Sequence, residues 1–334
     1  MGLGEKFFKS ADEDAPFFNT VLYDGTGVSN PITGVGFQPD LVWIKRRNIA
    51  TADHYIVDTV RGNGSNTYKN LASNEQEAEG TTTSSGITNS TIVDGGFTMQ
   101  GTGARTNANG SDYVAWCWKA GGAAVLNEEG TIDSQVSANV ANGFSIVKYK
   151  GTGTSGDSVG HGLDVRPDMV IIKNLDTSVT RWGVEVEGLG GYLKLDQTNG
   201  EASSHLFDIQ NTTFDLSTGT WTNTNNDDYI AYCFHSVTGV SKVGSFVGTN
   251  LPGNKQTTGF EPSWIMIKRT STTGGWTIID NKRTPLNKYL SANSDAIEAS
   301  ATSPIVFEND GFSFGGTGVS FNQSGETAIY YAIA

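Results

Sequence analysis

Several residue types that mark particular classes of protein are scarce in this chain. Only two of its 334 residues are cysteine, and 22 lysines and arginines stand against 35 aspartates and glutamates, which leaves a formal net charge of −13. So acidic a chain repels the phosphate backbone of DNA and RNA. No window approaches the ~18 consecutive apolar residues that a membrane helix needs. We therefore expect neither a nucleic-acid partner nor a membrane partner.

Sequence motifs of the common catalytic and metal sites are also missing. The histidines at 54, 161, 205 and 235 show no zinc-ligand spacing, and the chain has no Walker loop and no Gly-x-Ser-x-Gly nucleophile elbow. The first ten residues lack the apolar core and the small-residue cleavage site of a secretory signal. The sequence therefore predicts a non-enzymatic protein without a cofactor or a metal, and one that is not exported through such a signal.

What the chain does contain is a phrase that occurs three times. It reads Pro-Asp-Leu-Val-Trp-Ile-Lys at 39–45, Pro-Asp-Met-Val-Ile-Ile-Lys at 167–173 and Pro-Ser-Trp-Ile-Met-Ile-Lys at 262–268. An aromatic residue and a Gly-Thr turn precede each copy at nearly equal spacing, and a second apolar phrase closes each copy, at 113–118, 229–234 and 328–333. Such regular self-similarity is the signature of tandem duplication.

The duplication divides the chain into repeat units. We place an N-terminal extension at 1–16, repeats at 17–122, 143–239 and 240–334, and a linker at 123–142. Beads on a string and a ring around a pseudo-axis are both compatible with this order.

The composition of the repeats predicts strands joined by tight turns. The recurring phrases are rich in Val, Ile, Tyr, Trp and Phe, the segments between them in Gly, Ser, Thr, Asn and Asp. The run 41–44 is apolar without alternation, which suits a strand covered on both faces, and we pair it with 113–118 as a neighbouring core strand. The Gly-Thr turns are interpreted as hairpin turns, in which glycine supplies the positive φ. We predict an all-β fold of three tandem related antiparallel β-sandwich repeats, jelly-roll-like in type.

One lysine ends each copy of the first phrase: Lys45, Lys173 and Lys268. We interpret these lysines as structural. The stem would pack along the sandwich, and the ammonium would bind loop carbonyls or an acid of the same repeat, such as Asp58 or Asp280. A contact between subunits is the alternative.

Aromatic residues outside the apolar phrases are the candidates for intermolecular contacts. Phe7, Phe8, Phe17 and Phe18 flank a short acidic stretch and predict an anchor in a groove of a neighbouring protein, with a frayed first strand as the alternative. Trp221, in a polar segment, is the candidate platform for stacking a sugar ring.

Two further sets of residues have structural explanations. Cys117 and Cys233 occupy equivalent positions in two repeats, so we expect them to be buried, reduced and far apart. The loops 107–112 and 223–228 are rich in Asn and Asp, which favour turns. Calcium coordination by their oxygen atoms is the alternative for these loops.

The phrases 36–45 and 113–122 closely resemble a repeat found in virion proteins of tailed bacteriophages, especially marine and cyanobacterial ones, and the resemblance runs from residue 17 to 334. It implies a structural protein on the outside of the virion, either a capsid decoration component or a head or tail fibre component, folded in the host cytoplasm before assembly. The implied partners are other virion proteins of the capsid or tail and further copies of the chain in a symmetric homo-oligomer such as a trimer. A fibre module that binds host surface glycans is the alternative. The resemblance assigns no catalytic or binding residue.

Overall fold

Strands make up nearly all of the regular structure of this protein. The structure, a computed structural model, describes residues 16–62, 68–82, 86–87, 91–285, 287–301, 305–317 and 321–334. Within these residues the named strands pair antiparallel, and the regular helical structure that we describe is one 3-10 turn, η2 (Val140–Asn142). No helix in the described ranges is long and apolar enough to span a membrane. The predicted antiparallel all-β class is confirmed.

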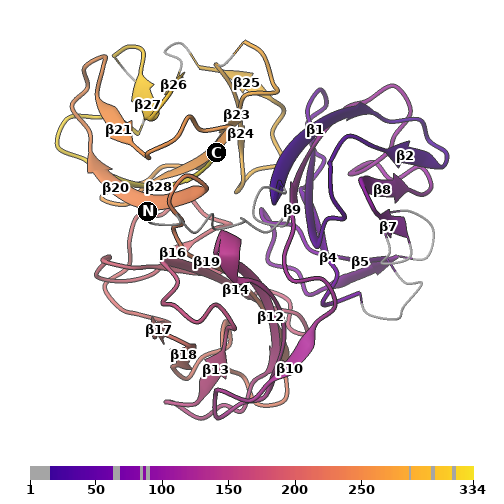
Figure 1. Ribbon diagram of the computed structural model, residues 1–334, viewed down its shortest axis with the longest axis vertical. Helices are drawn as coiled ribbons and strands as arrows, with labels where there is room; N and C mark the ends of the chain where they lie inside the picture. Colours follow the sequence, from indigo (N-terminus) through magenta and orange to yellow (C-terminus); the bar gives the residue numbers. More distant parts are fainter. Residues whose placement is uncertain are drawn as a thin grey trace, which may run out of the picture.

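The sheets form three groups, which we call lobes (Figure 1). The first lobe contains β1 (Phe18–Asp24), β2 (Asn30–Ile32), β3 (Leu41–Arg46), β4 (Tyr55–Asp58), β5 (Tyr68–Asn70), β6 (Gly80–Thr82), β7 (Ile92–Val93), β8 (Gly96–Met99) and β9 (Asp112–Trp118). The second contains β10 (Val125–Asn127), β11 (Ser134–Asn139), β12 (Phe144–Lys150), β13 (Ser158–Gly160), β14 (Met169–Asn174), β15 (Gly183–Val186), β16 (Leu193–Lys194), β17 (Phe207–Ile209), β18 (Thr213–Leu216) and β19 (Asp228–Phe234). The third contains β20 (Ser241–Val247), β21 (Lys255–Thr257), β22 (Trp264–Arg269), β23 (Trp276–Asp280), β24 (Lys288–Ser291), β25 (Ala299–Ser300), β26 (Ile305–Glu308), β27 (Gly311–Phe314) and β28 (Thr327–Ile333).

One strand order recurs in the long sheets of all three lobes. It runs β1-β9-β3-β4 in the first lobe, β12-β19-β14-β15 in the second and β20-β28-β22-β23 in the third. A three-stranded sheet accompanies each long sheet, with the orders β2-β8-β7, β13-β18-β17 and β21-β27-β26. The two apolar phrases are adjacent in every lobe, because β3 pairs with β9, β14 with β19 and β22 with β28. The predicted pairing of the phrases is confirmed.

Each long sheet is buried on both faces. In β3, Leu41 and Trp43 point into a core at the centre of the molecule, whereas Val42 and Ile44 point into the core between the two sheets of the first lobe. Successive side chains of a strand point to opposite faces, so a strand with two covered faces needs an unbroken apolar run. The expectation from residues 41–44 is confirmed.

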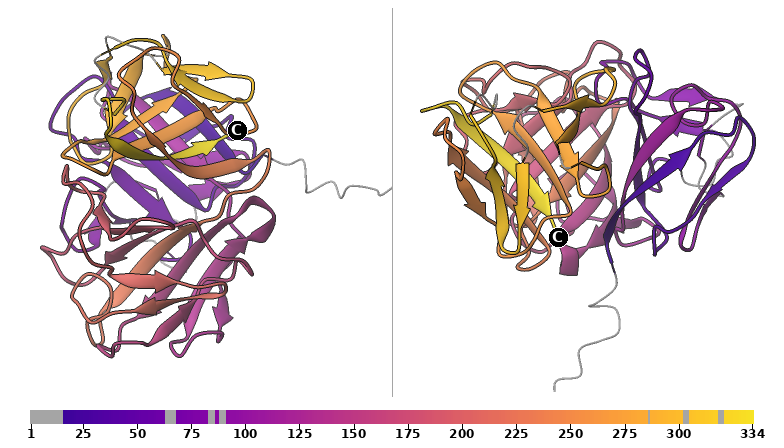
Figure 2. Two further views of the ribbon diagram at one scale, coloured as in Figure 1. Left: turned by 90° about the vertical axis from the view of Figure 1, so that its left-hand side faces the viewer. Right: turned by 90° about the horizontal axis from the view of Figure 1, so that it is seen from above.

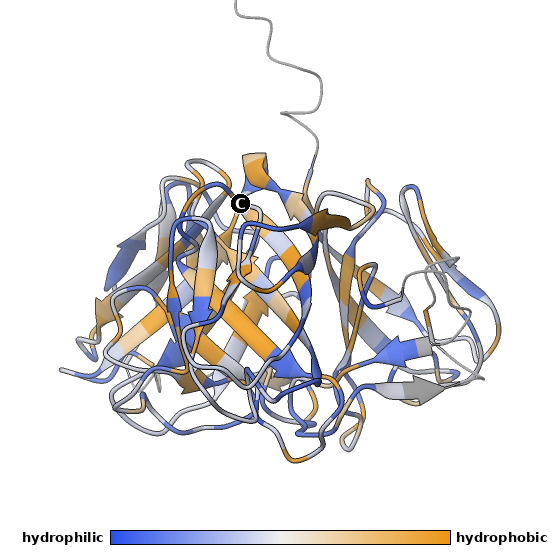
Figure 3. Cartoon of the chain, turned by 90° about the horizontal axis from the view of Figure 1, so that it is seen from below, coloured by the Kyte–Doolittle hydropathy of each residue, from blue (hydrophilic) through white to orange (hydrophobic). Residues whose placement is uncertain are grey.

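The central core joins the three lobes around a common centre (Figures 1 and 2). The rings of Trp118 and Trp264 approach to 5.7 Å between centroids, and those of Phe234 and Tyr331 to 4.9 Å. In Figure 3 hydrophobic stretches lie on the strands at the centre of the view, and both strands and loops also carry hydrophilic stretches. The lobes therefore form a ring with one shared core.

Residues 123–142, expected as a linker, add a hairpin to the second lobe. Strand β10 pairs with β11, and β11 pairs with β12 over its whole length, from Ser134 opposite Tyr149 to Asn139 opposite Phe144. Strand β11, Ser-Gln-Val-Ser-Ala-Asn, is mainly polar, so its strand state depends on pairing with the edge of β12.

The Gly-Thr turns differ from the expected hairpin turns. In each lobe such a turn connects a strand of the long sheet to a strand of the short sheet, as between β1 and β2, so it forms a corner between sheets. Gly27 and Gly153 have φ of 72° and 75°, as expected for glycine in a tight turn.

Candidate functional site

The three recurring lysines are buried at contacts between lobes. Lys45 has the strand phase of Leu41 and Trp43, so its side chain leaves the sheet on the central face, and all three lysines are fully buried. Their Nζ atoms donate hydrogen bonds to backbone carbonyls of another lobe: Lys45 to Asp295 (3.2 Å), Lys173 to Gln76 (3.2 Å) and Lys268 to Thr198 (3.0 Å). These contacts run in a cycle, from the first lobe to the third, from the third to the second and from the second to the first.

A second backbone contact accompanies each lysine. Three residues after each accepting carbonyl stands a glutamate whose N–H donates back to the lobe that supplies the lysine: Glu79 to Leu175 (2.8 Å), Glu201 to Thr270 (2.7 Å) and Glu298 to Arg47 (2.9 Å). The carbonyls that accept from the glutamates belong to Leu175, Thr270 and Arg47, and each of these residues lies two positions after the lysine of its own lobe. Adjacent lobes are thus joined by the same pair of hydrogen bonds three times.

Burial dominates the electrostatics of these ammonium groups. Removal from water lowers the pKa of Lys45, Lys173 and Lys268 to about 8. Of the two kinds of partner that the sequence left open, carbonyl oxygens hold the ammonium groups. Asp58 and Asp280 instead bind Arg61 and Arg283 of their own lobes.

An aromatic N–H donor forms a further contact at each junction. Nε2 of His54 bonds to the carbonyl of Ser291 (3.0 Å), Nε1 of Trp182 to that of Ala72 (3.0 Å) and Nε1 of Trp276 to that of Lys194 (2.8 Å). Nδ1 of His54 accepts from Nε1 of Trp43 (2.8 Å), so the ring proton lies on Nε2. Burial lowers the pKa of His54 to about 3, which keeps the ring neutral. Sequence reasoning missed these donors, because the first copy has a histidine where the other two have a tryptophan. The signal that could have found them is their position, since each follows the lysine of its lobe by eight or nine residues.

Two junctions also contain a buried ion pair. Nε of Arg61 donates to Asp58, and the hydroxyl of Tyr232 from the second lobe donates to the same carboxylate (2.8 Å). The pair Arg283–Asp280 likewise accepts a hydrogen bond from Nε1 of Trp116 of the first lobe (3.0 Å). The second lobe has Val186 and Leu189 at these positions, and both pack against the central core. A polar or an apolar junction therefore fits the same backbone.

Trp221 forms a partly exposed aromatic cluster with Tyr192 and Lys194. The two rings are perpendicular with centroids 5.5 Å apart, and Nζ of Lys194 lies 5.7 Å from the Trp221 centroid and 5.9 Å from that of Tyr192. Six of the seven tryptophans are buried, and Trp221 is half-buried. The structure thus leaves part of this ring accessible at the surface.

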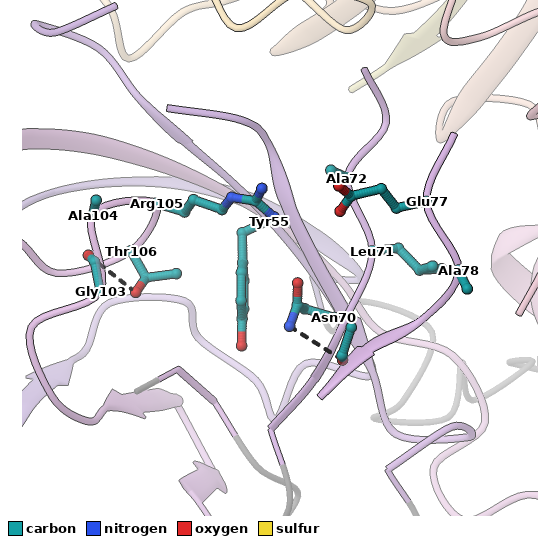
Figure 4. A pocket seen from close by; sticks show the side chains of 11 residues that line it. Tyr55, Asn70, Leu71, Ala72, Glu77, Ala78, Gly103, Ala104, Arg105 and Thr106 are labelled. Atoms are coloured by element: carbon teal, nitrogen blue, oxygen red, sulfur yellow. Dashed lines mark hydrogen bonds between the residues drawn. The ribbon is translucent and has the colours of Figure 1, made fainter. Parts of the chain in front are cut away.

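A cavity of about 450 Å³ lies in the first lobe (Figure 4). Tyr55 stands at its centre in the figure, with Arg105 above it and Asn70 and Glu77 on the opposite side. The guanidinium of Arg105 is bound by Asp53, so its charge is already offset. Arg105 precedes its lobe's Tyr strand by the same spacing as Trp221, so the cavity corresponds to the surface of the Trp221 cluster.

Of the four phenylalanines expected to anchor the chain in a neighbouring protein, two are buried in the core of this protein. Phe17 and Phe18 are each only 7% exposed, and the ring of Phe18 lies 4.8 Å from that of Trp118 and 5.8 Å from that of Trp264. They close the central core and are unavailable to another protein. Phe7 and Phe8 lie outside the described residues.

The Asn-rich loops bind the corners between sheets. Oδ1 of Asn107 accepts from the N–H of Thr26 (3.0 Å), and Oδ1 of Asn223 accepts from the N–H of Thr152 (2.9 Å). Asn322 makes the same contact in the third lobe. The structure shows the turn-stabilising role for these amides, and the described ranges contain no group of three or more His, Cys, Asp or Glu side chains placed to hold a metal ion.

Both cysteines are buried and free, as predicted. Cys117 lies in the core of the first lobe and Cys233 in that of the second. Burial raises the pKa of both thiols, that of Cys233 to about 12, which leaves little reactive thiolate at neutral pH.

Comparison with known protein families places the whole ring in one family. Residues 13–334 match the model of a domain of unknown function, DUF7483. The chain belongs to the DUF7483 family. Because the match extends over all three lobes, a DUF7483 domain corresponds to the ring and not to a single lobe. No curated protein and no solved structure matched the chain.

Proposed function

We propose that this DUF7483 protein is a non-enzymatic structural component on the exterior of a tailed-phage virion, as capsid decoration or as part of a head or tail fibre. It would act through protein–protein assembly, with capsid or tail proteins and further copies of itself as partners. The unit of its fold would be one β-sandwich, present three times in tandem. The pairing of the first strand of a copy with its last, as of β1 with β9, supports a jelly-roll-like unit.

The observation that carries this proposal is the use of the recurring polar residues. Lys45, Lys173 and Lys268 recur in every lobe, and all three are consumed in contacts between lobes. The polar residues that all three copies retain therefore serve to hold the lobes together. Acidic loops rich in Gly, Asn and Thr cover its outside, as suits an exposed particle coat. The resemblance of the phrases to phage virion repeats supplies the location.

Gold-labelled antibodies against this protein test the location directly on purified phage particles. We expect label on the outside of intact virions, at symmetry-related positions on the head or along a fibre. The control is an antibody against a protein packaged inside the head, which should not label intact particles. Abundant protein in infected cells together with unlabelled, protein-free virions would refute the proposal.

Glycan binding is the second candidate function, and the cluster of Trp221, Tyr192 and Lys194 favours it. Sugar rings stack on exposed aromatic faces, and the two perpendicular rings with an ammonium beside them form such a surface. A glycan array with host surface polysaccharides tests this, with Trp221→Ala expected to lose about ten-fold in affinity. Val179→Ala, a change at an exposed site of the same lobe, is the matched control. Equal binding by Trp221→Ala and wild type would exclude this surface.

A further inference from the structure

The cavity of the first lobe aligns residue by residue with the aromatic cluster of the second lobe. In the first lobe Leu71 lies opposite Ile56, and in the second Leu193 lies opposite Val184. Ile56 and Val184 each follow the recurring lysine of their lobe by eleven positions. Leu71 and Leu193 therefore occupy equivalent places, and so do the residues on either side of them.

At these aligned positions the first lobe has smaller or more polar side chains than the second. Three positions differ in this way: Asn70 for Tyr192, Ala72 for Lys194 and Arg105 for Trp221. In the second lobe the two rings and the ammonium pack against one another. In the first lobe the same region is a cavity of about 450 Å³, within the range of ~300–1,000 Å³ that is typical of pockets for small molecules. The first lobe is thus open where the second lobe is filled.

The cavity combines hydrogen-bonding groups with an apolar wall. Asn70 is only 7% exposed, and its Nδ2 donates to the carbonyl of Gly80 (3.3 Å). Its Oδ1 lies on the other side, next to the ring of Tyr55 and turned into the cavity (Figure 4). The side chain of Arg105 is 35% exposed, and Asp53 binds one of its five N–H groups. The apolar part of the wall consists of Leu71, Ala72, Ala78 and Ala104.

The charges around the cavity are mainly negative. Glu77 lines the cavity. Nδ2 of Asn74 donates to the carboxylates of Asp53 (2.8 Å) and Glu75 (3.0 Å), so three carboxylates stand near the single guanidinium of Arg105. The other charged groups nearby pair with one another: Arg61 with Asp58 and Glu79, and Lys69 with Glu79. A ligand that carries a carboxylate of its own would therefore be repelled.

We propose that this cavity binds one sugar unit of a glycan, either uncharged or amine-bearing. A sugar hydroxyl both donates and accepts hydrogen bonds. It accepts from the remaining N–H groups of Arg105, and it donates to Oδ1 of Asn70 or to the carboxylate of Glu77. The C–H face of the sugar ring packs against Leu71 and the neighbouring alanines. The negative surroundings exclude uronic and sialic acids. The site is separate from the surface at Trp221, and the proposal holds whether or not the protein is part of a virion.

A glycan array with neutral, amine-bearing and acidic oligosaccharides of bacterial surfaces tests the proposal on the full chain. The variant Asn70→Tyr/Arg105→Trp puts the two rings of the second lobe into the cavity. Val179→Trp, which adds a ring at a 79% exposed site of the second lobe, is the matched control. We expect wild type and Val179→Trp to bind non-acidic glycans alike, and the filled variant to lose about ten-fold or more in affinity. Glycans with a carboxylate should give no signal.

Two more variants keep the result interpretable. Arg105→Ala changes a partly exposed side chain, so the fold remains intact, and it should lose the same glycans because the guanidinium donors are gone. Trp221→Ala shows which surface holds a glycan, since binding lost through Trp221→Ala and kept by Arg105→Ala belongs to the Trp221 surface. That pattern for every bound glycan would overturn the proposal. So would a wild type that binds no non-acidic glycan or prefers acidic ones, or equal binding by wild type and Asn70→Tyr/Arg105→Trp.

Discussion

The buried lysines predict a particular dependence of stability on pH, which the variant Lys268→Met isolates. Nζ of Lys268 binds the carbonyls of Thr198 and Gly274 in a fully buried site, and burial lowers the pKa of this lysine to about 8. In the unfolded chain the pKa is about 10.4. Below pH 8 both states carry the proton, and the folded state bears the full cost of a buried charge. As the pH rises from 8 to 10.4, the folded state loses the proton first and that cost disappears.

The size of the effect follows from the two pKa values. Proton linkage predicts that, between pH 7.5 and pH 10, the free energy of unfolding of wild type rises by about 2 kcal/mol relative to that of Lys268→Met. Tyrosine and cysteine titrations occur in both proteins and cancel in the difference. Urea unfolding at several pH values measures it, and Lys255→Met, which removes an exposed lysine paired with Glu308 and Asp310, is the control without such a rise. A difference between wild type and Lys268→Met that is flat over this range would refute the assignment of a buried ammonium.

Three further changes test the junctions and cores by similar measurements. Arg61→Met leaves the Asp58 carboxylate as an unpaired buried charge, so urea unfolding should show that the free energy of unfolding falls by about 3–5 kcal/mol. The double variant Asp58→Val/Arg61→Leu, which copies the second lobe, should regain more than half of that loss. Equal losses in the two variants would contradict this explanation. Trp264→Ala removes a ring from the central core and should lower the free energy of unfolding by about 3–5 kcal/mol in the same assay. A decrease below about 1 kcal/mol would mean that the lobes do not share a core. Cys117 and Cys233 should react with a thiol reagent only at the rate of unfolding, followed by absorbance, and rapid labelling of the native protein would show that the lobe cores are open.

Side-chain chemistry explains which parts of this structure the sequence could predict. Leu41 and Trp43 alternate with Val42 and Ile44 in one apolar run, and this pattern indicated a strand with two covered faces. The same phase places Lys45 on the central face, a signal that was present in the sequence. A loop carbonyl was one of the two kinds of acceptor expected, but which carbonyl it is was not predictable.

The acceptors of the three lysines share no side chain that would identify them. They belong to Gln76, Thr198 and Asp295, and any residue presents the same carbonyl oxygen. At the junctions the sequence therefore shows the lysine donors, which recur in every copy, but does not show which carbonyls accept from them. The strand β11 was missed for a related reason, since its polar residues form a strand only against the open edge of β12.

Closure of the lobes into a cycle changes how the molecule can come apart. In a linear array the terminal units have one neighbour each, and they detach first. Here every lobe has two neighbours, so releasing one lobe requires two junctions to break at once. A protease cut in the connection between lobes would consequently leave the fragments together, and the body would withstand fraying from its ends.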